Sequence, residues 1–434
     1  MTTTDVEAEL REALAITEGQ YAASNPRSER RHRQAGTVLP GGNTRTSLYY
    51  SPFPVTFVAG EGRFLTDLDG HRYVDLLGEY SAGLYGHSDP VILSAARKAL
   101  DEGLSFGGPN RYEVELAEEI TRRFPSVELL RFTNSGTEAN LFAIGTARVV
   151  TGRSKILVFE SGYHGGVLSF RGEAPLNAPY PYVVCDYNDV PGTVAAIRRH
   201  ADDLAAVILE PMLGGGGAVP AADEFVRAIR EATARHDVVL VIDEVMTSRL
   251  APGGLQERLG VVPDLTTFGK YLGAGFSFGA FGGSRRLMER FDPSVPGHLS
   301  HPGTFNNNTV TMAAGLAGLR EVFTPEAVRE LNARGDRLRD RLNSLFVEFD
   351  VAVQATGAGS ILGVHFQRSP IASGRHIDPA PDKRTLLHLE LMMRGFYMAR
   401  RGYMALPLPV TNADLDAFTD AVADVVVTHR RVLR

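Results

Sequence analysis

The chain has 434 residues, 44% of them hydrophobic and 22% charged, and a formal net charge of −6. These values are ordinary for a soluble globular protein and exclude a disordered or collagen-like chain. The negative charge argues against nucleic acid as the main partner, and the single cysteine, Cys185, cannot form an internal disulfide. Because no run approaches roughly 18 apolar residues and the N-terminus lacks a signal-peptide pattern, we expect a cytoplasmic protein without a membrane segment.

The first segment, residues 1–75, is predicted to belong to a smaller domain. Its first 40 residues favour one amphipathic helix followed by an arginine-rich turn at Arg27–Arg33. Three β-like stretches, at residues 55–58, 63–67 and 71–74, are separated by short turns and are typical of an antiparallel meander.

Residues 76–325 are predicted to form a large layered α/β domain. Short aliphatic runs alternate there with longer segments of helical pattern, as expected of strands buried on both faces of a parallel sheet. The strand candidates are Leu129–Phe132, Lys155–Phe159, Tyr182–Cys185, Ala205–Leu209, Val238–Ile242 and Phe278–Gly282. The helix candidates are Tyr112–Phe124, Gly136–Val150, Thr193–His200 and Ala222–His236.

Residues 326–434 are predicted to complete the smaller domain with an α+β pattern. Leucines at 331, 338, 342 and 345 mark a long amphipathic helix. A β-like run follows at Ile361–Phe366, then helices at Arg384–Met393 and from about Asn412.

Polar or glycine-rich segments follow several strands of the large domain, where ligands bind in such sheets. Ser135-Gly136-Thr137 opens a helix and offers free N–H groups and two hydroxyls to a phosphate, with an ordinary N-cap as the alternative. Tyr163-His164 lies between glycines and is suited to stacking on a planar ligand, with a plain turn as the alternative. Glu210 leads into glycines 214–217, which fit a flexible loop better than a phosphate cradle because no lysine follows at the required spacing.

Two further strand ends carry single charged residues. Asp243 ends an intensely apolar strand, where a carboxylate needs a cation such as a protonated pyridine nitrogen; a metal ligand or a helix cap is the alternative. Lys270 lies among apolar and glycine residues, where desolvation lowers the pKa of an amine that attacks a carbonyl; a surface lysine is the alternative. Together the segments supply a phosphate cup, a stacking ring, a carboxylate and an amine, which is the set that pyridoxal phosphate needs.

These segments follow one another as an ordered set, which also includes Gly303-Thr304. The set resembles the class III aminotransferases, which are fold type I enzymes dependent on pyridoxal phosphate. The resemblance covers roughly residues 35–430 and implies a mostly parallel seven-stranded sheet flanked by helices. The motifs NSGTEAN and DEVMTSR resemble the branch that includes glutamate-1-semialdehyde aminomutase. The residues that follow Lys270 and Thr304 differ from those of the aminomutase. They are more similar to the β-amino acid transaminases that act on aromatic substrates such as β-phenylalanine.

The resemblance implies a role for each matched residue. Lys270 holds the cofactor aldehyde and moves a proton, Asp243 pairs with the ring N–H, and Tyr163 and Val245 cover the two ring faces. The other implied cofactor-binding residues are Ser135, Gly136 and Thr137 at the phosphate, His164, Glu210 and Met246 near the ring, and Thr304 at the phosphate of the neighbouring subunit's cofactor. A homodimer is therefore implied, and no metal is expected.

Arg45 and Arg401 match the positions of substrate-carboxylate clamps in the β-amino acid transaminases, and Tyr80 is expected to wall the substrate pocket. An arginine fork suits a carboxylate because it binds both oxygens. The predicted reaction moves the amino group of an aromatic β-amino acid to 2-oxoglutarate or pyruvate in a ping-pong cycle. The alternative is an isomerase of the aminomutase type. A third hypothesis is a non-catalytic protein of this fold, and the presence of both Lys270 and Asp243 argues against it.

Overall fold

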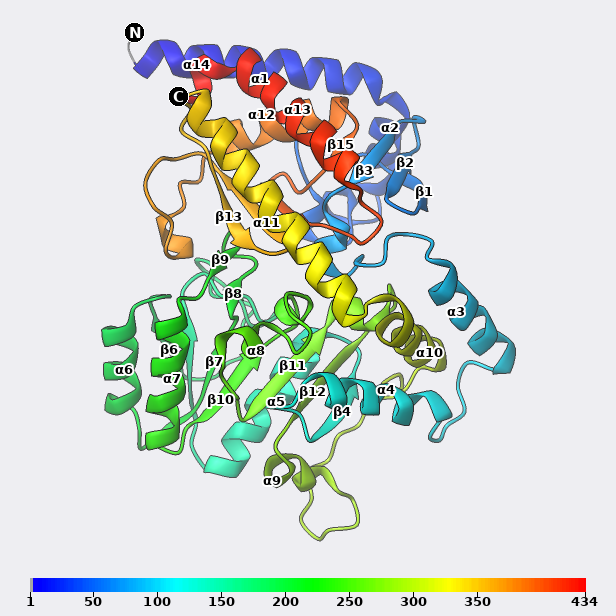
Figure 1. Cartoon of the computed structure of the whole chain (residues 1–434), viewed down its shortest axis with the longest axis vertical. Helices are drawn as coiled ribbons and strands as arrows, with labels where there is room; N and C mark the ends of the chain where they lie inside the picture. Colours follow the sequence, from blue (N-terminus) through cyan, green and yellow to red (C-terminus); the bar gives the residue numbers. More distant parts are fainter. Residues whose placement is uncertain (1–2) are drawn as a thin grey trace.

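The computed structural model describes residues 3–434, which stack two layered parts along the long axis of the molecule (Figure 1). The lower part in Figure 1 holds a large sheet flanked by helices, and the upper part holds smaller sheets beneath a layer of helices. None of the helices within residues 3–434 combines the length and apolar character needed to cross a bilayer. The predicted domain boundaries at residues 75 and 325 stay a prediction.

The large sheet confirms the predicted mostly parallel arrangement of seven strands. Its order is β4-β12-β11-β10-β7-β5-β6, and only β12 runs antiparallel to its neighbours. The strands are β4 (Leu129–Thr133), β12 (Gly279–Gly283), β11 (Leu265–Gly269), β10 (Val239–Asp243), β7 (Leu204–Leu209), β5 (Lys155–Phe159) and β6 (Tyr182–Cys185).

Strand β11 is missing from the strands predicted from sequence. It contains Thr266 and Thr267 in the middle of its five residues, and so it does not form a continuous apolar run. Both threonines are fully buried because their hydroxyls are hydrogen-bonded, Thr266 with Ser126 at 3.1 Å and Thr267 to Asn140 at 2.6 Å. Buried hydroxyls are tolerated when they find partners in this way.

Alternation along each strand explains how the sheet is covered on both faces. In β10, Val239 and Val241 pack in one apolar cluster with α5, whereas Leu240 and Ile242 pack in another with α7. Successive strand residues point to opposite faces, so a sheet covered on both sides needs apolar residues at every position. The helices of this part are α3 (Pro90–Glu102), α4 (Arg111–Arg123), α5 (Gly136–Thr151), α6 (Val190–Arg199), α7 (Asp223–Arg235), α8 (Leu255–Leu259), α9 (Arg285–Met288) and α10 (Thr309–Ala317).

The upper part is built from both ends of the chain. Strand β15 near the C-terminus joins the N-terminal meander as a parallel neighbour of β3. The sheets are β1 (Phe57–Glu61), β2 (Phe64–Asp67), β3 (Arg72–Asp75) and β15 (Phe396–Tyr397); β13 (Gln354–Ala358), β14 (Ile361–His365) and β16 (Tyr403–Ala405); and a hairpin of β8 (Met212–Leu213) and β9 (Val219–Pro220).

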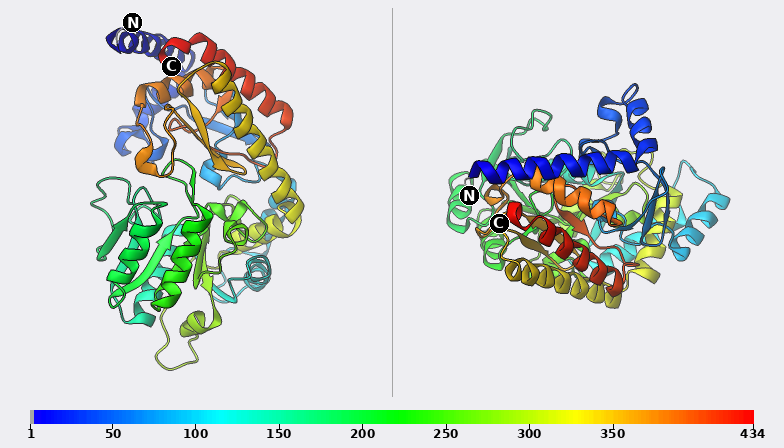
Figure 2. Two further views of the ribbon diagram at one scale, coloured as in Figure 1. Left: turned by 60° about the vertical axis from the view of Figure 1, so that its left-hand side comes forward. Right: turned by 90° about the horizontal axis from the view of Figure 1, so that it is seen from above.

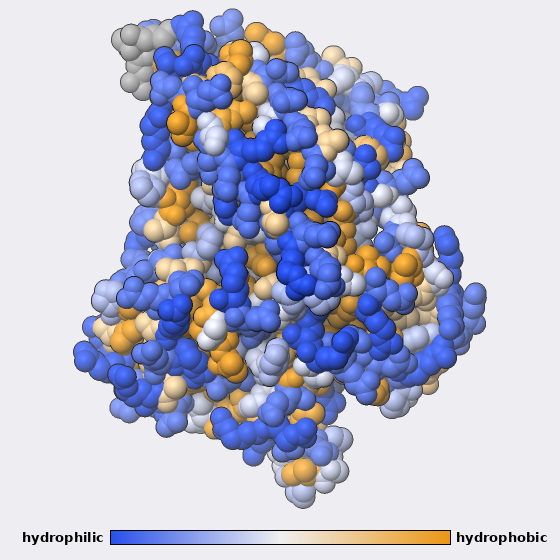
Figure 3. Space-filling view, viewed as in Figure 1, coloured by the Kyte–Doolittle hydropathy of each residue, from blue (hydrophilic) through white to orange (hydrophobic). Residues whose placement is uncertain are grey.

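A layer of long helices covers these small sheets. Seen from above in Figure 2, α1, α12, α13 and α11 lie side by side, and contacts join each to the next. On the face shown in Figure 3, apolar side chains occur in separate groups among mostly hydrophilic residues. The helices are α1 (Thr3–Ser24), α2 (Pro26–Ala35), α11 (Pro325–Glu348), α12 (Pro381–Met393), α13 (Asn412–Thr428) and α14 (Arg430–Leu433).

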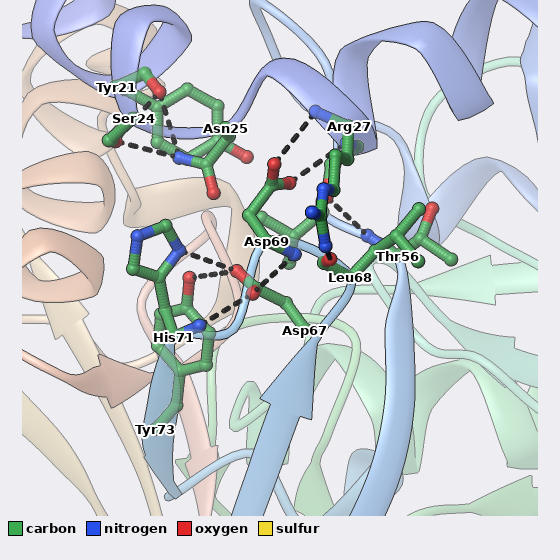
Figure 4. Close-up of polar contacts among 12 residues, drawn as sticks. Tyr21, Ser24, Asn25, Arg27, Thr56, Asp67, Leu68, Asp69, His71 and Tyr73 are labelled. Atoms are coloured by element: carbon green, nitrogen blue, oxygen red, sulfur yellow. Dashed lines mark hydrogen bonds and ion pairs between the residues drawn. The ribbon is translucent and has the colours of Figure 1, made fainter.

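The arginine-rich turn predicted at residues 27–33 is wrong, because this stretch forms helix α2. The N-cap residue Asn25 makes no side-chain cap, but Asp69 accepts hydrogen bonds from the backbone N–H groups of Arg27 at 2.7 Å and Ser28 at 2.9 Å (Figure 4). A carboxylate at a helix N-terminus stabilises the helix through its free N–H groups. This cap comes from the turn between β2 and β3, so no local pattern could predict it.

Candidate active site

Four neighbouring strands, β10, β11, β12 and β4, bring several of the predicted site residues to one edge of the large sheet. In the register, Asp243 of β10 lies beside Thr267 of β11, Gly269 of β11 beside Gly279 of β12, and Gly279 beside Thr133 of β4. The residues that follow β4 and β11 are therefore brought to the same edge as Asp243. This is the edge at which α/β sheets bind ligands.

Lys270 follows β11 directly and adopts an uncommon backbone conformation. Its φ angle of 55° lies in the left-handed region, which a non-glycine residue occupies only where its surroundings hold it there. Burial lowers the pKa of its amine, Asp243 opposes this shift, and the charge of Arg401 adds to it. Among residues 3–434 the amine has no hydrogen-bond or ion-pair partner, so it is available to a carbonyl compound.

Asp243 is 3% exposed and accepts hydrogen bonds on both oxygens. His164 Nδ1 and Asn140 Nδ2 each lie 2.8 Å from Oδ2, and the N–H of Val245 donates to Oδ1 at 3.0 Å. Asn140 in turn accepts from Thr267 Oγ1 at 2.6 Å. These hydrogen bonds orient the buried carboxylate of Asp243, which has no Lys or Arg ion-pair partner in the described chain. Such a carboxylate is suited to pair with a cationic group of a ligand.

The residues predicted to bind a phosphate lie at the start of helix α5. Ser135 is its N-cap and accepts from the N–H of Glu138 at 3.2 Å, while the first N–H groups of a helix have no partner within it. A Cβ at Gly136 would lie 2.8 Å from Val245, and one at Gly165 would lie 2.3 Å from Thr137 Oγ1. A larger residue at either position would collide with these side chains, so glycine lets Val245 and Thr137 pack closely against the backbone at the start of α5.

Tyr163 and Glu210 are joined across the same edge. The N–H of Tyr163 donates to Glu210 Oε2 at 2.8 Å, and the N–H of Gly214 donates to Oε1 at 3.0 Å. Burial raises the pKa of Glu210 to about 7, with the His164 ring opposing the shift. The side chain of Tyr163 is held at the site edge with 44% exposure, as a ring that covers a ligand must be.

The substrate candidates meet around one tyrosine. The guanidinium carbons of Arg45 and Arg401 lie 5.7 Å and 5.1 Å from the centre of the Tyr80 ring, which stacks on Tyr403 at 5.8 Å. Arg45 also forms an exposed ion pair with Glu79. A substrate carboxylate would therefore compete with Glu79 for Arg45.

The two remaining candidates are Met246 and Thr304. Met246 is buried, and its sulfur accepts from the Tyr403 hydroxyl at 3.2 Å. Thr304 is exposed in the loop before α10, which Asn306 joins to Asn134 through a 3.0 Å hydrogen bond. An exposed position is compatible with contact to a second chain.

Sequence reasoning missed Asn140, although a signal was present. A buried polar residue one turn into the apolar helix α5 needs a partner, and Asn140 lies four residues after Gly136 on the same helical face. It also missed Arg171 and Arg384, which come from a loop and from α12 and show no shared pattern.

Comparison with known proteins agrees with this geometry. Residues 47–426 match the family described as aminotransferase class III. The chain is 46% identical over 424 residues to the β-phenylalanine transaminase of Variovorax paradoxus, covering 97% of this chain and 98% of that protein. The solved β-phenylalanine aminotransferase from the same organism superposes with a TM-score of 0.95. A glutamate-1-semialdehyde 2,1-aminomutase of Rhodopirellula baltica is 37% identical over 368 residues, 80% of this chain and 83% of that protein.

The fold and the site together define an enzyme of the fold type I class that depends on pyridoxal phosphate. Within that class, the chain belongs to the class III aminotransferase family. The predicted resemblance, cofactor and class of activity are thereby confirmed.

A buried carboxyl next to the site makes stability depend on pH. Glu244 is fully buried, accepts from Thr247 and from the N–H of Gln256, and has a pKa raised by burial from 4.5 to about 7. As the pH rises from about 4.5 through 7, the unfolded chain loses this proton first, so the free energy of unfolding falls. We expect the Glu244→Gln variant to lack this contribution, so that its free energy of unfolding falls by about 3 kcal/mol less than that of the wild type over this pH range.

Urea unfolding of the cofactor-free protein at pH 5 and pH 8 measures this effect. Between the two pH values, the free energy of unfolding should fall further, or rise less, in the wild type than in the variant. The dependence that both proteins share includes Glu210, whose pKa is raised in the same direction, and the buried His365 and His388, whose lowered pKa values act in the opposite direction. An equal pH dependence in both proteins would contradict the buried, protonated state of Glu244.

Proposed function

We propose that the enzyme transfers the amino group of an aromatic β-amino acid, such as β-phenylalanine, to 2-oxoglutarate or pyruvate in a ping-pong cycle. The observation that carries the proposal is the pair of arginines, Arg45 and Arg401, on Tyr80 beside Lys270. This arrangement provides a fork for a carboxylate next to an aromatic wall, both within the electrostatic range of the reacting amine. The 46% identity to the β-phenylalanine transaminase of Variovorax paradoxus supports the same donor.

The residues at the sheet edge fit pyridoxal phosphate. The start of α5 offers N–H groups that have no partner within the helix, and Asp243 is a buried acceptor without a Lys or Arg ion-pair partner in the described chain. The cofactor supplies an aldehyde and a protonated ring that stabilises negative charge at the substrate carbon. Ser135, Gly136 and Thr137 would bind its phosphate, and Asp243, oriented by His164 and Asn140, would hold the proton on its ring nitrogen.

The neighbouring side chains position the ring and move the proton. Lys270 Nζ would hold the cofactor aldehyde and would move a proton at the substrate carbon. Tyr163 and Val245 would cover the ring, and Glu210 and Met246, which both contact Gly214, would support this enclosure. Exclusion of water by these side chains strengthens the Asp243 interaction.

The proposed assembly is a cytoplasmic homodimer. Thr304 is exposed and has no hydrogen bond elsewhere in residues 3–434, which supports a contact to the phosphate of the neighbouring subunit's cofactor. Sedimentation equilibrium together with Thr304→Ala tests this: the variant should stay dimeric and bind the cofactor more weakly.

The donor is tested by a half-reaction with β-phenylalanine and no keto acid. The absorbance of the cofactor aldehyde should disappear in the wild type, because the amino group is transferred to it. Arg45→Met should reduce kcat/KM for β-phenylalanine about 10- to 100-fold, since a charge-assisted hydrogen bond contributes about 1.5–3 kcal/mol.

Arg33→Met is the matched control, because Arg33 forms an exposed ion pair with Glu29 at 2.9 Å, as Arg45 does with Glu79, but lies on α2. It should react as wild type does. A wild-type enzyme that leaves the absorbance unchanged would rule out this donor, and conversion of glutamate-1-semialdehyde without any keto acid would favour the aminomutase instead.

A further inference from the structure

A cavity of about 360 Å³ lies between the large sheet and the small sheets, beside the site described above. Its walls come from segments that are far apart in the chain: the loop after β5, the turn between β8 and β9, strand β14, and residues of α12 and of the segment before β16. Four of the lining residues are arginines and one is acidic: Arg171, Arg375, Arg384 and Arg401, with Glu160.

The positive charge of this cavity is unbalanced. Arg375 forms ion pairs with Glu160 at 3.1 Å and with Asp186 at 2.5 Å. Among residues 3–434, no carboxylate forms an ion pair with Arg171, Arg384 or Arg401. The other ionisable wall residues are His365 and Tyr403. Burial lowers the pKa of His365 to about 4 and raises that of Tyr403 to about 12, so both side chains are neutral near pH 7.

The three unpaired arginines also retain free hydrogen-bond donors. The Nε atoms of Arg384 and Arg401 are both buried without a partner, although Arg384 Nη2 donates to the Asp378 carbonyl at 3.1 Å. Arg171 keeps contact with solvent, yet desolvation in the cavity and the charge of Arg401 lower its pKa. Buried donors and like charges held together are costly unless an anion occupies the space between them.

The cavity is connected to the reacting groups through Arg401. This residue lines the cavity, lies 5.1 Å from the centre of the Tyr80 ring, and contributes to the lowered pKa of Lys270. On the other side, a Cβ at Gly215 would lie 3.2 Å from Tyr163 Cβ and 3.4 Å from Arg171 Nη1. The cavity therefore begins directly behind the tyrosine proposed to cover the cofactor ring, and Arg45 is not among the residues that line it.

From this geometry we infer that the cavity binds the second carboxylate of a dicarboxylic keto acid acceptor, with Arg171 and Arg384 as the residues that set acceptor specificity. The inference rests on the proposed ping-pong transamination and deepens it. Arg45 takes the carboxylate next to the keto group, and the arginine cavity takes the distal one. A chain of five carbons with a carboxylate at each end fits a space of this size, and a shorter monocarboxylate leaves the cavity charge unbalanced.

The test compares two acceptors of equal length, 2-oxoglutarate and 2-oxopentanoate, on enzyme that carries the aminated cofactor. In the wild type, kcat/KM should favour 2-oxoglutarate by at least 10-fold. Arg384→Met and Arg171→Met should each lower this preference about 10- to 100-fold, with little change for 2-oxopentanoate. The preference is a ratio, so a variant that is only partly folded still gives a valid answer.

A second readout needs no turnover. Calorimetric titration of the holoenzyme with glutarate, a five-carbon dicarboxylate without a keto group, should show binding weakened about 10- to 100-fold in both variants. Arg400→Met is the control, because Arg400 donates to Thr385 at 3.3 Å and does not line the cavity but carries the same charge nearby.

Two outcomes would overturn the inference: a wild type without preference for 2-oxoglutarate, or a preference that changes less than about threefold in both cavity variants. Failure of the proposed donor is seen separately, as a wild type that does not react with β-phenylalanine, since the acceptor comparison starts from enzyme already aminated.

Discussion

Lys270→Ala is expected to lower the rate of transamination by at least about 10³-fold and to abolish the absorbance change that accompanies cofactor binding. In the proposed mechanism the Lys270 amine holds the cofactor aldehyde and moves the proton, and a methyl group can do neither. Because the Lys270 amine has no hydrogen-bond partner among residues 3–434, the free energy of unfolding of the cofactor-free variant should fall by no more than about 1 kcal/mol. Stopped-flow absorbance and urea unfolding separate the two effects.

Lys155→Ala is the matched control for this substitution. Lys155 is half-buried at the start of β5 and pairs with Asp203 at 2.7 Å, so its loss removes an amine from the same sheet without touching the site edge. It should keep wild-type absorbance and activity. If Lys270→Ala retained both, the central assignment of the site would be wrong.

Asp243→Asn is expected to lower kcat about 10²–10³-fold, because a neutral amide cannot hold the proton on a ring nitrogen in this buried position. The substitution keeps the shape but not the hydrogen bonds. Both Asp243 oxygens accept, from His164, Asn140 and the N–H of Val245, and an amide nitrogen in place of one oxygen would face a donor. Steady-state kinetics at saturating cofactor measures the effect on kcat.

Glu244→Gln provides the comparison for Asp243→Asn. Glu244 is the next residue and is equally buried, but its carboxyl is bonded to Thr247 and to the N–H of Gln256, away from Lys270. It should change the pH dependence of stability and leave kcat near the wild-type value. A similar loss of kcat in both variants would show that burial, not the ring contact, makes Asp243 important.

Local patterns in the sequence were sufficient for the parts of the fold that are determined locally. The strands Lys155–Phe159 and Tyr182–Cys185 have the predicted bounds, and the helix from Asn412 begins as predicted. Capping residues and apolar periodicity lie within a few residues of each such element. The motif residues of the cofactor site also follow their strands directly, so the parallel sheet alone brings them together.

The missed features depend on contacts between distant segments. Helix α2 is capped by Asp69 from a turn about 40 residues away, and β11 contains threonines whose hydroxyls are satisfied by Asn140 and Ser126. Arg171 and Arg384 meet only after the small sheets have packed on the large one. Such partners cannot be deduced from the spacing of residues in the sequence, because the local sequence does not specify which distant residue will make the contact.

The sheet shared by the two ends of the chain imposes an order on biosynthesis. Strand β3 pairs with β15, and Thr17 in α1 donates to Glu390 in α12 at 2.9 Å across 373 residues of sequence. At 5–20 residues per second, a ribosome needs roughly 20 to 75 s to make the missing partner. During that time the meander carries an open strand edge that can pair with other chains. The upper part of the molecule therefore closes last, after nearly the whole polypeptide has been made, and the nascent N-terminus must be kept from other strands until then.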